Sequence, residues 1–189
     1  VYGDDPSVNL LQEKVSKLLG KEDSLFLTSG TQSNLCAMLA HCQRGEEIIT
    51  GNNYHVFIDE AGGASVLGGI MMYPINTNED GSLNLADIEN GIKPNDPHCP
   101  ITKLLCVENT VSGKVQGLDQ LKKYSNLTNK YKLRLHMDGA RLMNAAVKLN
   151  LSAKELVRNM DTVSLCLSKG LGSPVGSVLS GSSDIIKKA

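Results

Sequence analysis

The sequence predicts an α/β fold of three layers, α/β/α, in which helices cover both faces of a mostly parallel β-sheet. Two observations support this prediction. Short apolar runs typical of strands alternate along the chain with segments that have the periodicity of amphipathic helices. The chain has 189 residues, 41% of them hydrophobic, and shows neither repeats nor low-complexity linkers. We therefore expect one globular domain with a sizeable core.

The elements can be assigned in order. The segment 6–19 places Val8, Leu11, Val15 and Leu18 at helical spacing behind an Asp-Pro start, so it predicts a helix. A short strand over 24–28 follows, and "TSGTQSN" opens a second helix that runs through His41. The remaining predicted elements are the strands 47–50, 70–74, 103–108, 133–137 and 163–167 and the helices 59–67, 85–92, 118–131 and 141–148.

Composition disfavours several classes of protein. The formal net charge of -1 does not predict nucleic-acid binding, and no apolar stretch has the length of a membrane span. Because the chain begins at Val1, the lack of a leader says little about location. The five cysteines are an odd count within mostly apolar runs, which favours reduced thiols and a cytoplasmic or organellar-matrix compartment. His98 and Cys99 are adjacent rather than spaced like zinc ligands, so we predict no metal site.

Ligands of parallel sheets bind beyond the carboxyl ends of the strands, so the residues there are the candidates for a site. Ser29, Gly30 and Thr31 follow the first strand and form a helix N-terminus suited to phosphate, although the serine is also an ordinary N-cap. Asp138 follows the strand 133–137, where the alternative is a solvated loop residue or a helix cap.

Lys169 follows the strand 163–167 in the segment "CLSKGLGSPVG". A lysine in this position ordinarily reaches solvent. The glycines at 170, 172 and 176 favour a second interpretation, since they allow the backbone to approach a ligand closely. The spacing matches neither the dinucleotide-binding pattern nor the P-loop. A lysine that reacts with a carbonyl group remains, and a phosphate cradle, a carboxylate and a lysine together suggest pyridoxal phosphate.

Six segments together resemble the low-specificity L-threonine aldolases, in order and over the whole chain. They are "VYGDDPSVNLLQEKVSKLLGKE", "TSGTQSN", "DEAGGASVLG" with the histidine before it, "KLLCVENTVSGKV", "HMDGARLMNA" and "LCLSKGLGSPVGSVLSG". The resemblance implies the large cofactor-binding domain of a pyridoxal 5′-phosphate enzyme of the aspartate aminotransferase fold type I. It also implies cleavage of L-threonine and L-allo-threonine to glycine and acetaldehyde.

The same resemblance implies a role for each matching residue. Lys169 resembles the Schiff-base lysine, Asp138 the partner of the pyridinium nitrogen, and Arg141 a cofactor-anchoring arginine. Gly30 and Thr31 resemble the phosphate-binding pair, beside Ser29. His55 resembles the histidine that stacks over the cofactor ring, and His98 one near the substrate hydroxyl. From the residues alone, both histidines would be surface groups. Glu60 either orders His55 or begins a helix, His136 is a packed residue with local hydrogen bonds, and His41 a partner of a helix C-terminus.

The resemblance also defines what this chain lacks. We expect residues 1–189 to correspond to the large domain alone, cut at both ends, without the C-terminal small domain that supplies an arginine for the substrate carboxylate in the family. Two alternatives therefore stay open: another pyridoxal-phosphate lyase or transaminase of the same fold, and a non-catalytic fragment. The expected partners are a small amino-acid substrate and further copies of the chain, as a homodimer or homotetramer with Tyr2 near a neighbouring site, and neither nucleic acid nor membrane.

Overall fold

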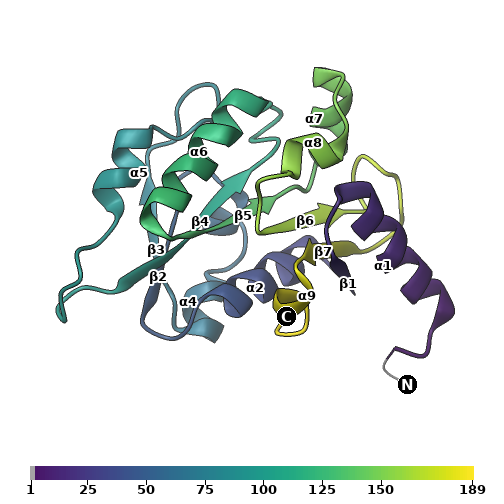
Figure 1. Ribbon diagram of the computed structural model, residues 1–189, viewed down its shortest axis with the longest axis horizontal. Helices are drawn as coiled ribbons and strands as arrows, with labels where there is room; N and C mark the ends of the chain where they lie inside the picture. Colours follow the sequence, from purple (N-terminus) through teal and green to yellow (C-terminus); the bar gives the residue numbers. More distant parts are fainter. Residues whose placement is uncertain (1–2) are drawn as a thin grey trace.

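The computed structural model describes residues 3–189, and a seven-stranded sheet runs through its centre (Figure 1). Tyr2 lies outside the described residues. The strands are β1 (Asp23–Leu27), β2 (Glu46–Gly51), β3 (Met71–Ile75), β4 (Ile101–Glu108), β5 (Arg134–Asp138), β6 (Thr162–Cys166) and β7 (Ser177–Gly181). The helices are α1 (Pro6–Leu19), α2 (Gly30–His41), α3 (His55–Ile58), α4 (Gly63–Gly68), α5 (Leu85–Gly91), α6 (Leu118–Tyr131), α7 (Leu142–Leu149), α8 (Ala153–Val157) and α9 (Ser183–Ile186).

The strands lie in the order β1-β7-β6-β5-β4-β2-β3. The pairs β6/β5, β5/β4, β4/β2 and β2/β3 are parallel, whereas β7 runs antiparallel to both of its neighbours, β1 and β6. Pro74, which lacks an N–H group, lies in the edge strand β3, where a missing donor is tolerated. The predicted mostly parallel α/β fold is therefore confirmed.

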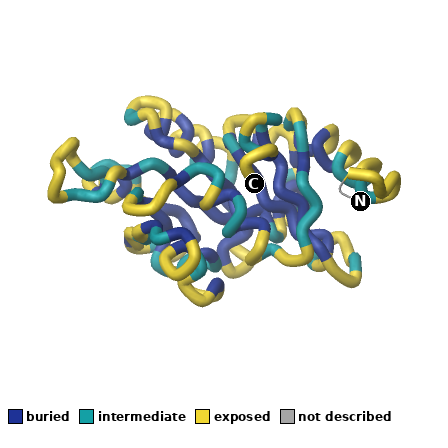
Figure 2. Tube along the Cα trace, turned by 90° about the horizontal axis from the view of Figure 1, so that it is seen from below, coloured by how far each residue is buried: buried dark blue, intermediate teal, exposed yellow. Residues whose placement is uncertain are grey.

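Helices pack on both faces of the sheet. In Figure 1, α2, α4 and α9 lie below the sheet, α5, α6, α7 and α8 lie above it, and α1 lies at the right beside β1 and β7. The contacts agree, since α2 packs on β6 and β7, α6 on β5, and α1 on β1 and β7. Figure 2 shows the buried segments running through the middle of the molecule, with the exposed segments outside. Ile48, Leu104, Leu105, Leu135 and Val163 from four strands are all at most 1% exposed, so the sheet forms the centre of the core.

The structure differs from the predicted elements in three places. The helix predicted over 59–67 is replaced by α3 and α4, because Ala61 and Gly62 have positive φ angles of 53° and 65° that interrupt a right-handed helix. In the last turn of α1, Leu19 is fully buried and Leu18 is 42% exposed, so Leu19 takes the place of Leu18 on the predicted apolar face. The strand β7 and the short helices α8 and α9 were not predicted.

Two predictions about cysteine and histidine chemistry can also be assessed. All five cysteines are free, as predicted; Cys42, Cys106 and Cys166 are buried and the other two are half-buried. His41 was predicted to act on a helix C-terminus, but burial lowers its pKa to about 4, so the ring is neutral and instead hydrogen-bonds Thr162. Among residues 3–189, no helix combines the length and the apolar character needed to cross a membrane.

Candidate functional site

One pocket lies where the carboxyl ends of β4, β5 and β6 meet the N-terminus of α2. Its volume of about 350 Å³ is within the usual range for cofactor and small-molecule sites. The pocket is lined by every residue that was predicted to bind the cofactor, namely Ser29, Gly30, Thr31, His55, Asp138, Arg141 and Lys169. These residues come from four separate segments of the chain, so only the fold brings them together.

His98 does not join them. Its side chain is 91% exposed and its Nδ1 hydrogen-bonds Asp96 at 2.8 Å, in the loop that precedes β4. The opposite end of β4 carries Glu108, which lines the pocket. The eight residues of this strand separate the two ends by roughly 25 Å, so within this chain His98 is remote from the pocket.

The N-terminus of α2 forms one wall of the pocket. Ser29 caps the helix, because its Oγ accepts a hydrogen bond from the N–H of Gln32 at 3.1 Å. The N–H groups of Gly30 and Thr31 belong to the first turn, where no intrahelical acceptor exists. A Cβ added at Gly30 would lie 2.8 Å from the Sγ of Cys166, so only glycine lets this turn lie so close to β6. The wall thus presents unpaired donors and a helix dipole suited to an anion.

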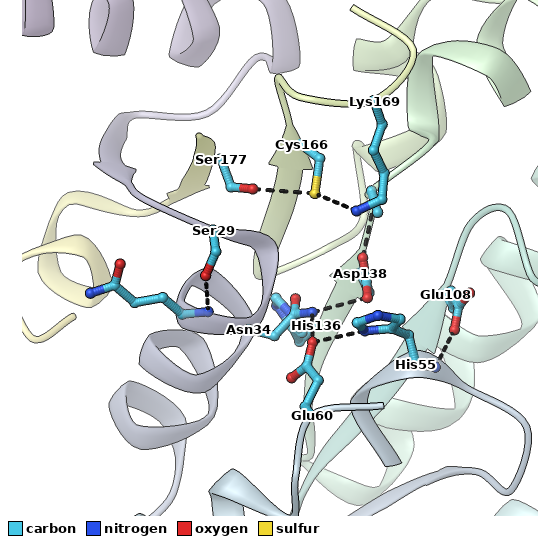
Figure 3. A network of polar contacts seen from close by, with 12 residues as sticks. Ser29, Asn34, His55, Glu60, Glu108, His136, Asp138, Cys166, Lys169 and Ser177 are labelled. Carbon is cyan, nitrogen blue, oxygen red and sulfur yellow. Dashed lines mark hydrogen bonds and ion pairs between the residues drawn. The ribbon is translucent and has the colours of Figure 1, made fainter. Parts of the chain in front are cut away.

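Lys169 lies on the connection between β6 and β7, on the opposite side of the pocket from His55 (Figure 3). Its Nζ is 3.5 Å from the Sγ of Cys166, which also accepts a hydrogen bond from the Oγ of Ser177 at 3.2 Å. The side chain is half-buried and lines the pocket rather than extending into solvent, as an ordinary strand-end lysine would.

Two of the glycines beside Lys169 are required by the protein itself, and the close approach of this backbone to a ligand stays a prediction. A Cβ at Gly170 would lie 2.2 Å from the side-chain oxygen of Asn144, and one at Gly176 would lie 2.5 Å from the ring of Phe26. Gly176 also has a φ of 100°, which L-residues rarely adopt. These two glycines therefore shape the lysine-bearing loop through contacts with the protein itself.

Asp138 ends β5 and is only 3% exposed. Its Oδ1 accepts a hydrogen bond from the N–H of Ala140 at 3.0 Å, and its Oδ2 accepts one from the Nδ2 of Asn34 at 2.9 Å. The hydrogen bond from Ala140 is a local turn contact, of the kind expected if Asp138 were only a loop residue or a helix cap. The second comes from α2, far away in the sequence, and it turns the carboxylate into a buried group of the pocket.

Glu60 orders His55, which decides an alternative that the sequence left open. Glu60 lies between α3 and α4, is 4% exposed, and its Oε1 is 3.0 Å from the Nδ1 of His55. Asn34 donates to the same oxygen at 2.8 Å. The Nδ1 of His55 therefore donates to Glu60, and the residue lines the pocket. Burial raises the pKa of Glu60, and the nearby charge of Asp138 adds to this shift.

Glu108 is a pocket carboxyl that the sequence prediction missed. It is the last residue of β4, pairs in register with Asp138, and is 9% exposed. The N–H of His55 donates to its Oε2 at 2.7 Å. Burial, together with the negative charge of Asp138, raises its pKa to about 7. Its position at the end of a buried strand was the signal that could have identified it.

The carboxylates of Glu60 and Asp138 and the ring of His55 also have the composition of a metal site, with their ligand atoms within 4.8 Å of one another. The side-chain nitrogen of Asn34 lies between the two carboxylates and donates to both. A cation bound there would face these amide protons, so the group is better suited to hydrogen bonding than to a metal. The metal-free interpretation remains a prediction.

Fold and pocket together define an α/β protein that presents a lysine, a carboxylate and a helix N-terminus to one small-molecule site. Comparison with known proteins identifies the family. A family model described as beta-eliminating lyase matches residues 1–189, so the chain belongs to the beta-eliminating lyase family.

Individual relatives agree with this assignment. The chain is 50% identical over 189 residues to a low specificity L-threonine aldolase of Escherichia coli K12, covering 100% of this chain and 57% of the relative. It is 43% identical over 195 residues to a probable low-specificity L-threonine aldolase of Arabidopsis thaliana, covering 100% of this chain and 55% of the relative. A solved threonine aldolase structure from Leishmania major superimposes with a TM-score of 0.79 at 27% identity, covering 91% of this chain and 51% of that one. The chain thus spans little more than half the length of the relatives it matches.

Proposed function

We propose that this chain is the cofactor-binding part of a pyridoxal-phosphate lyase that cleaves L-threonine and L-allo-threonine to glycine and acetaldehyde. The observation that carries the proposal is the arrangement of Lys169, Asp138 and the α2 N-terminus around one pocket. Pyridoxal 5′-phosphate has an aldehyde, a basic ring nitrogen and a phosphate, so each of these groups has a partner of matching chemistry here. The identity to threonine aldolases of two organisms supports the choice of substrate.

In this proposal the residues of the chain hold the cofactor and direct its reactivity. Gly30 and Thr31 bind the phosphate through backbone N–H groups, with Arg141 as an additional anchor. Lys169 binds the aldehyde carbon through its amine. Asp138 hydrogen-bonds the ring nitrogen and keeps it protonated. The bound cofactor supplies an electron-accepting ring for the substrate bond that breaks.

The proton of the substrate β-hydroxyl needs an acceptor in the pocket. We assign this role to the Nε2 of His55, because Glu60 holds the proton of the same ring at Nδ1. The part that the resemblance assigned to His98 stays a prediction, since the structure places this residue at the other end of β4.

The proposal extends to assembly and compartment. Val66 and Leu67 on α4 are 75% and 65% exposed, and this apolar surface supports self-association as a dimer or tetramer. Five free cysteines support a reducing compartment, either the cytoplasm or an organellar matrix.

Reduction with borohydride tests the cofactor assignment directly. The full-length protein, loaded with pyridoxal 5′-phosphate and reduced, should carry the pyridoxyl group on Lys169 in a peptide map. Lys169→Ala should bind the cofactor without a covalent link and lose nearly all formation of glycine from L-threonine. An adduct on another lysine would refute the assignment. Formation of a 2-oxo acid in place of glycine would identify a different lyase or a transaminase.

Replacement of Asp138 tests the polarity of the site. Asp138→Asn keeps the shape of the side chain but removes its charge, so the ring nitrogen should lose its proton and turnover should fall by roughly two orders of magnitude or more. Near-normal turnover with unchanged cofactor affinity would show that Asp138 acts only in the local turn with Ala140.

A further inference from the structure

A continuous chain of hydrogen bonds leads from the pocket along the α2 face of the sheet to the far end of α2. It begins at Asp138, whose Oδ2 is 2.9 Å from the Nδ2 of Asn34 (Figure 3). The Oδ1 of Asn34 is 3.1 Å from the Nε2 of His136, and the Nδ1 of that ring is 2.9 Å from the Oγ1 of Thr162. The same hydroxyl is 2.9 Å from the Nε2 of His41.

Three elements bring these side chains together. Asn34 and His41 are seven residues apart on α2, which places them two turns apart on one face of the helix. His136 and Asp138 are two residues apart on β5 and therefore point to the same face of the sheet. Thr162 on β6 pairs in register with His136. This chain of hydrogen bonds thus lies between α2 and the strands β5 and β6. Only Asp138 and Asn34 among its members line the pocket.

The direction of every hydrogen bond follows from the pocket end. Asp138 and Glu60 both bond the same amide atom of Asn34, and two carboxylates require a donor there, so that atom is nitrogen. The amide oxygen then faces His136, whose Nε2 must donate. Burial lowers the pKa of His136 to about 3, so the ring is neutral and its Nδ1 accepts from the hydroxyl of Thr162.

The hydrogen bonds at the His41 end require the same donor and acceptor roles. The hydroxyl hydrogen of Thr162 points toward His136, so the hydroxyl oxygen accepts a hydrogen bond from the Nε2–H of His41. The Nδ1 of His41 is buried and has no hydrogen-bond partner. If every hydrogen bond ran in the opposite direction, the Nδ1 of His41 would carry a proton with no acceptor near it. A buried unpaired N–H is less tolerated than a buried unpaired acceptor. This reversal would also turn the amide oxygen of Asn34 toward Asp138 and Glu60.

We propose that His136, Thr162 and His41 form a positioning relay that fixes the amide of Asn34 and so holds Asp138 as a proton acceptor facing the cofactor nitrogen. The inference rests on the proposed function for the identity of the cofactor. For Asp138 to take a proton at Oδ2, the amide of Asn34 would have to rotate, and each hydrogen bond behind it would have to reverse. The relay therefore fixes the orientation of the Asn34 amide in a way that the immediate neighbours of Asp138 alone would not.

The test compares three variants of the full-length protein, each loaded with pyridoxal 5′-phosphate. Thr162→Val removes the hydroxyl and keeps the volume of the side chain, so the tautomer of His136 is no longer fixed. Thr162→Ser restores the hydroxyl. Thr50→Val is the control, because Thr50 is also fully buried but its Oγ1 has no partner. The readouts are the ¹⁵N resonances of the histidine rings and the dissociation constant of the cofactor.

We expect a single Nε2–H form of His136 in the wild-type protein and a mixture of forms in Thr162→Val. The dissociation constant should rise roughly five- to tenfold in Thr162→Val and return toward the wild-type value in Thr162→Ser, with no change in Thr50→Val. A wild-type His136 ring protonated at Nδ1, or unchanged resonances and affinity in Thr162→Val, would overturn the relay. A wild-type protein that never binds the cofactor covalently would instead overturn the proposed function, and the resonances of His136 would still report on the relay.

Discussion

The charge of Glu108 depends on pH within the physiological range. Its pKa of about 7 in the folded protein lies above the ordinary value of 4.5, so the folded state binds more protons than the unfolded state between these values. The free energy of unfolding should therefore fall as the pH rises from about 4.5 to about 7. Glu108→Gln removes this dependence, and we expect the variant to be more stable than wild type by about 3 kcal/mol at pH 8 and nearly equal to it at pH 5.

Thermal unfolding of the cofactor-free full-length protein at pH 5 and pH 8 measures this difference. Glu79→Gln serves as the control, because Glu79 is exposed and the same substitution there should change the melting temperature little at either pH. Equal stability of Glu108→Gln and wild type at pH 8 would show that Glu108 ionises without cost in the folded protein.

At the scale of elements, the close approach of α2 to β6 is what shapes the anion-binding wall. Gly30→Ala would place a methyl group 2.8 Å from the Sγ of Cys166, so the first turn of α2 has to move away from β6. We expect the affinity for pyridoxal 5′-phosphate, measured by titration of the visible absorption band, to fall by about tenfold or more. Gly63→Ala is the matched control, since Gly63 also begins a helix and its nearest neighbour would be 3.8 Å away.

A second variant makes the test of the wall specific. Cys166→Ala removes the atom that the new methyl group would meet, so the double variant Gly30→Ala/Cys166→Ala should recover part of the lost affinity. Loss of affinity to the same extent in Gly63→Ala would mean that the effect comes from general destabilisation of the protein and not from the wall.

The elements also show what sequence patterns can predict. The alternation of helix and strand was readable because buried parallel strands are short apolar runs, and the rule about their carboxyl ends then led to Asp138 and Lys169. The strand β7 was missed because "SVLSG" contains two serines and a glycine and follows a glycine-rich loop. Asn34 was missed because an asparagine inside a helix has no local signature, and its importance comes from contacts with Glu60 and Asp138 that are distant in sequence.

At the scale of the whole molecule, the exposed apolar surface of α4 bears on assembly. Val66→Lys places a charge on this surface, so it should shift the full-length protein toward monomers in sedimentation equilibrium while the far-ultraviolet circular dichroism stays unchanged. Val147→Lys is the matched control, since Val147 is 81% exposed on α7, which packs on the other face of the sheet. An unchanged association constant in Val66→Lys would exclude this part of α4 from the interface.

The position of β7 between β1 and β6 has a consequence for how the chain reaches its native state. Asp23 in β1 pairs with Gly181 in β7, so β1 cannot join the sheet until β7, far later in the chain, has left the ribosome. Pairings over such sequence separations are entropically costly to close and slow to form. Until then, both edges of β1 and one edge of β6 stay unpaired, and open strand edges are where nascent chains associate with one another. We expect this half of the sheet to form last and to be the part of the molecule that most needs protection during synthesis.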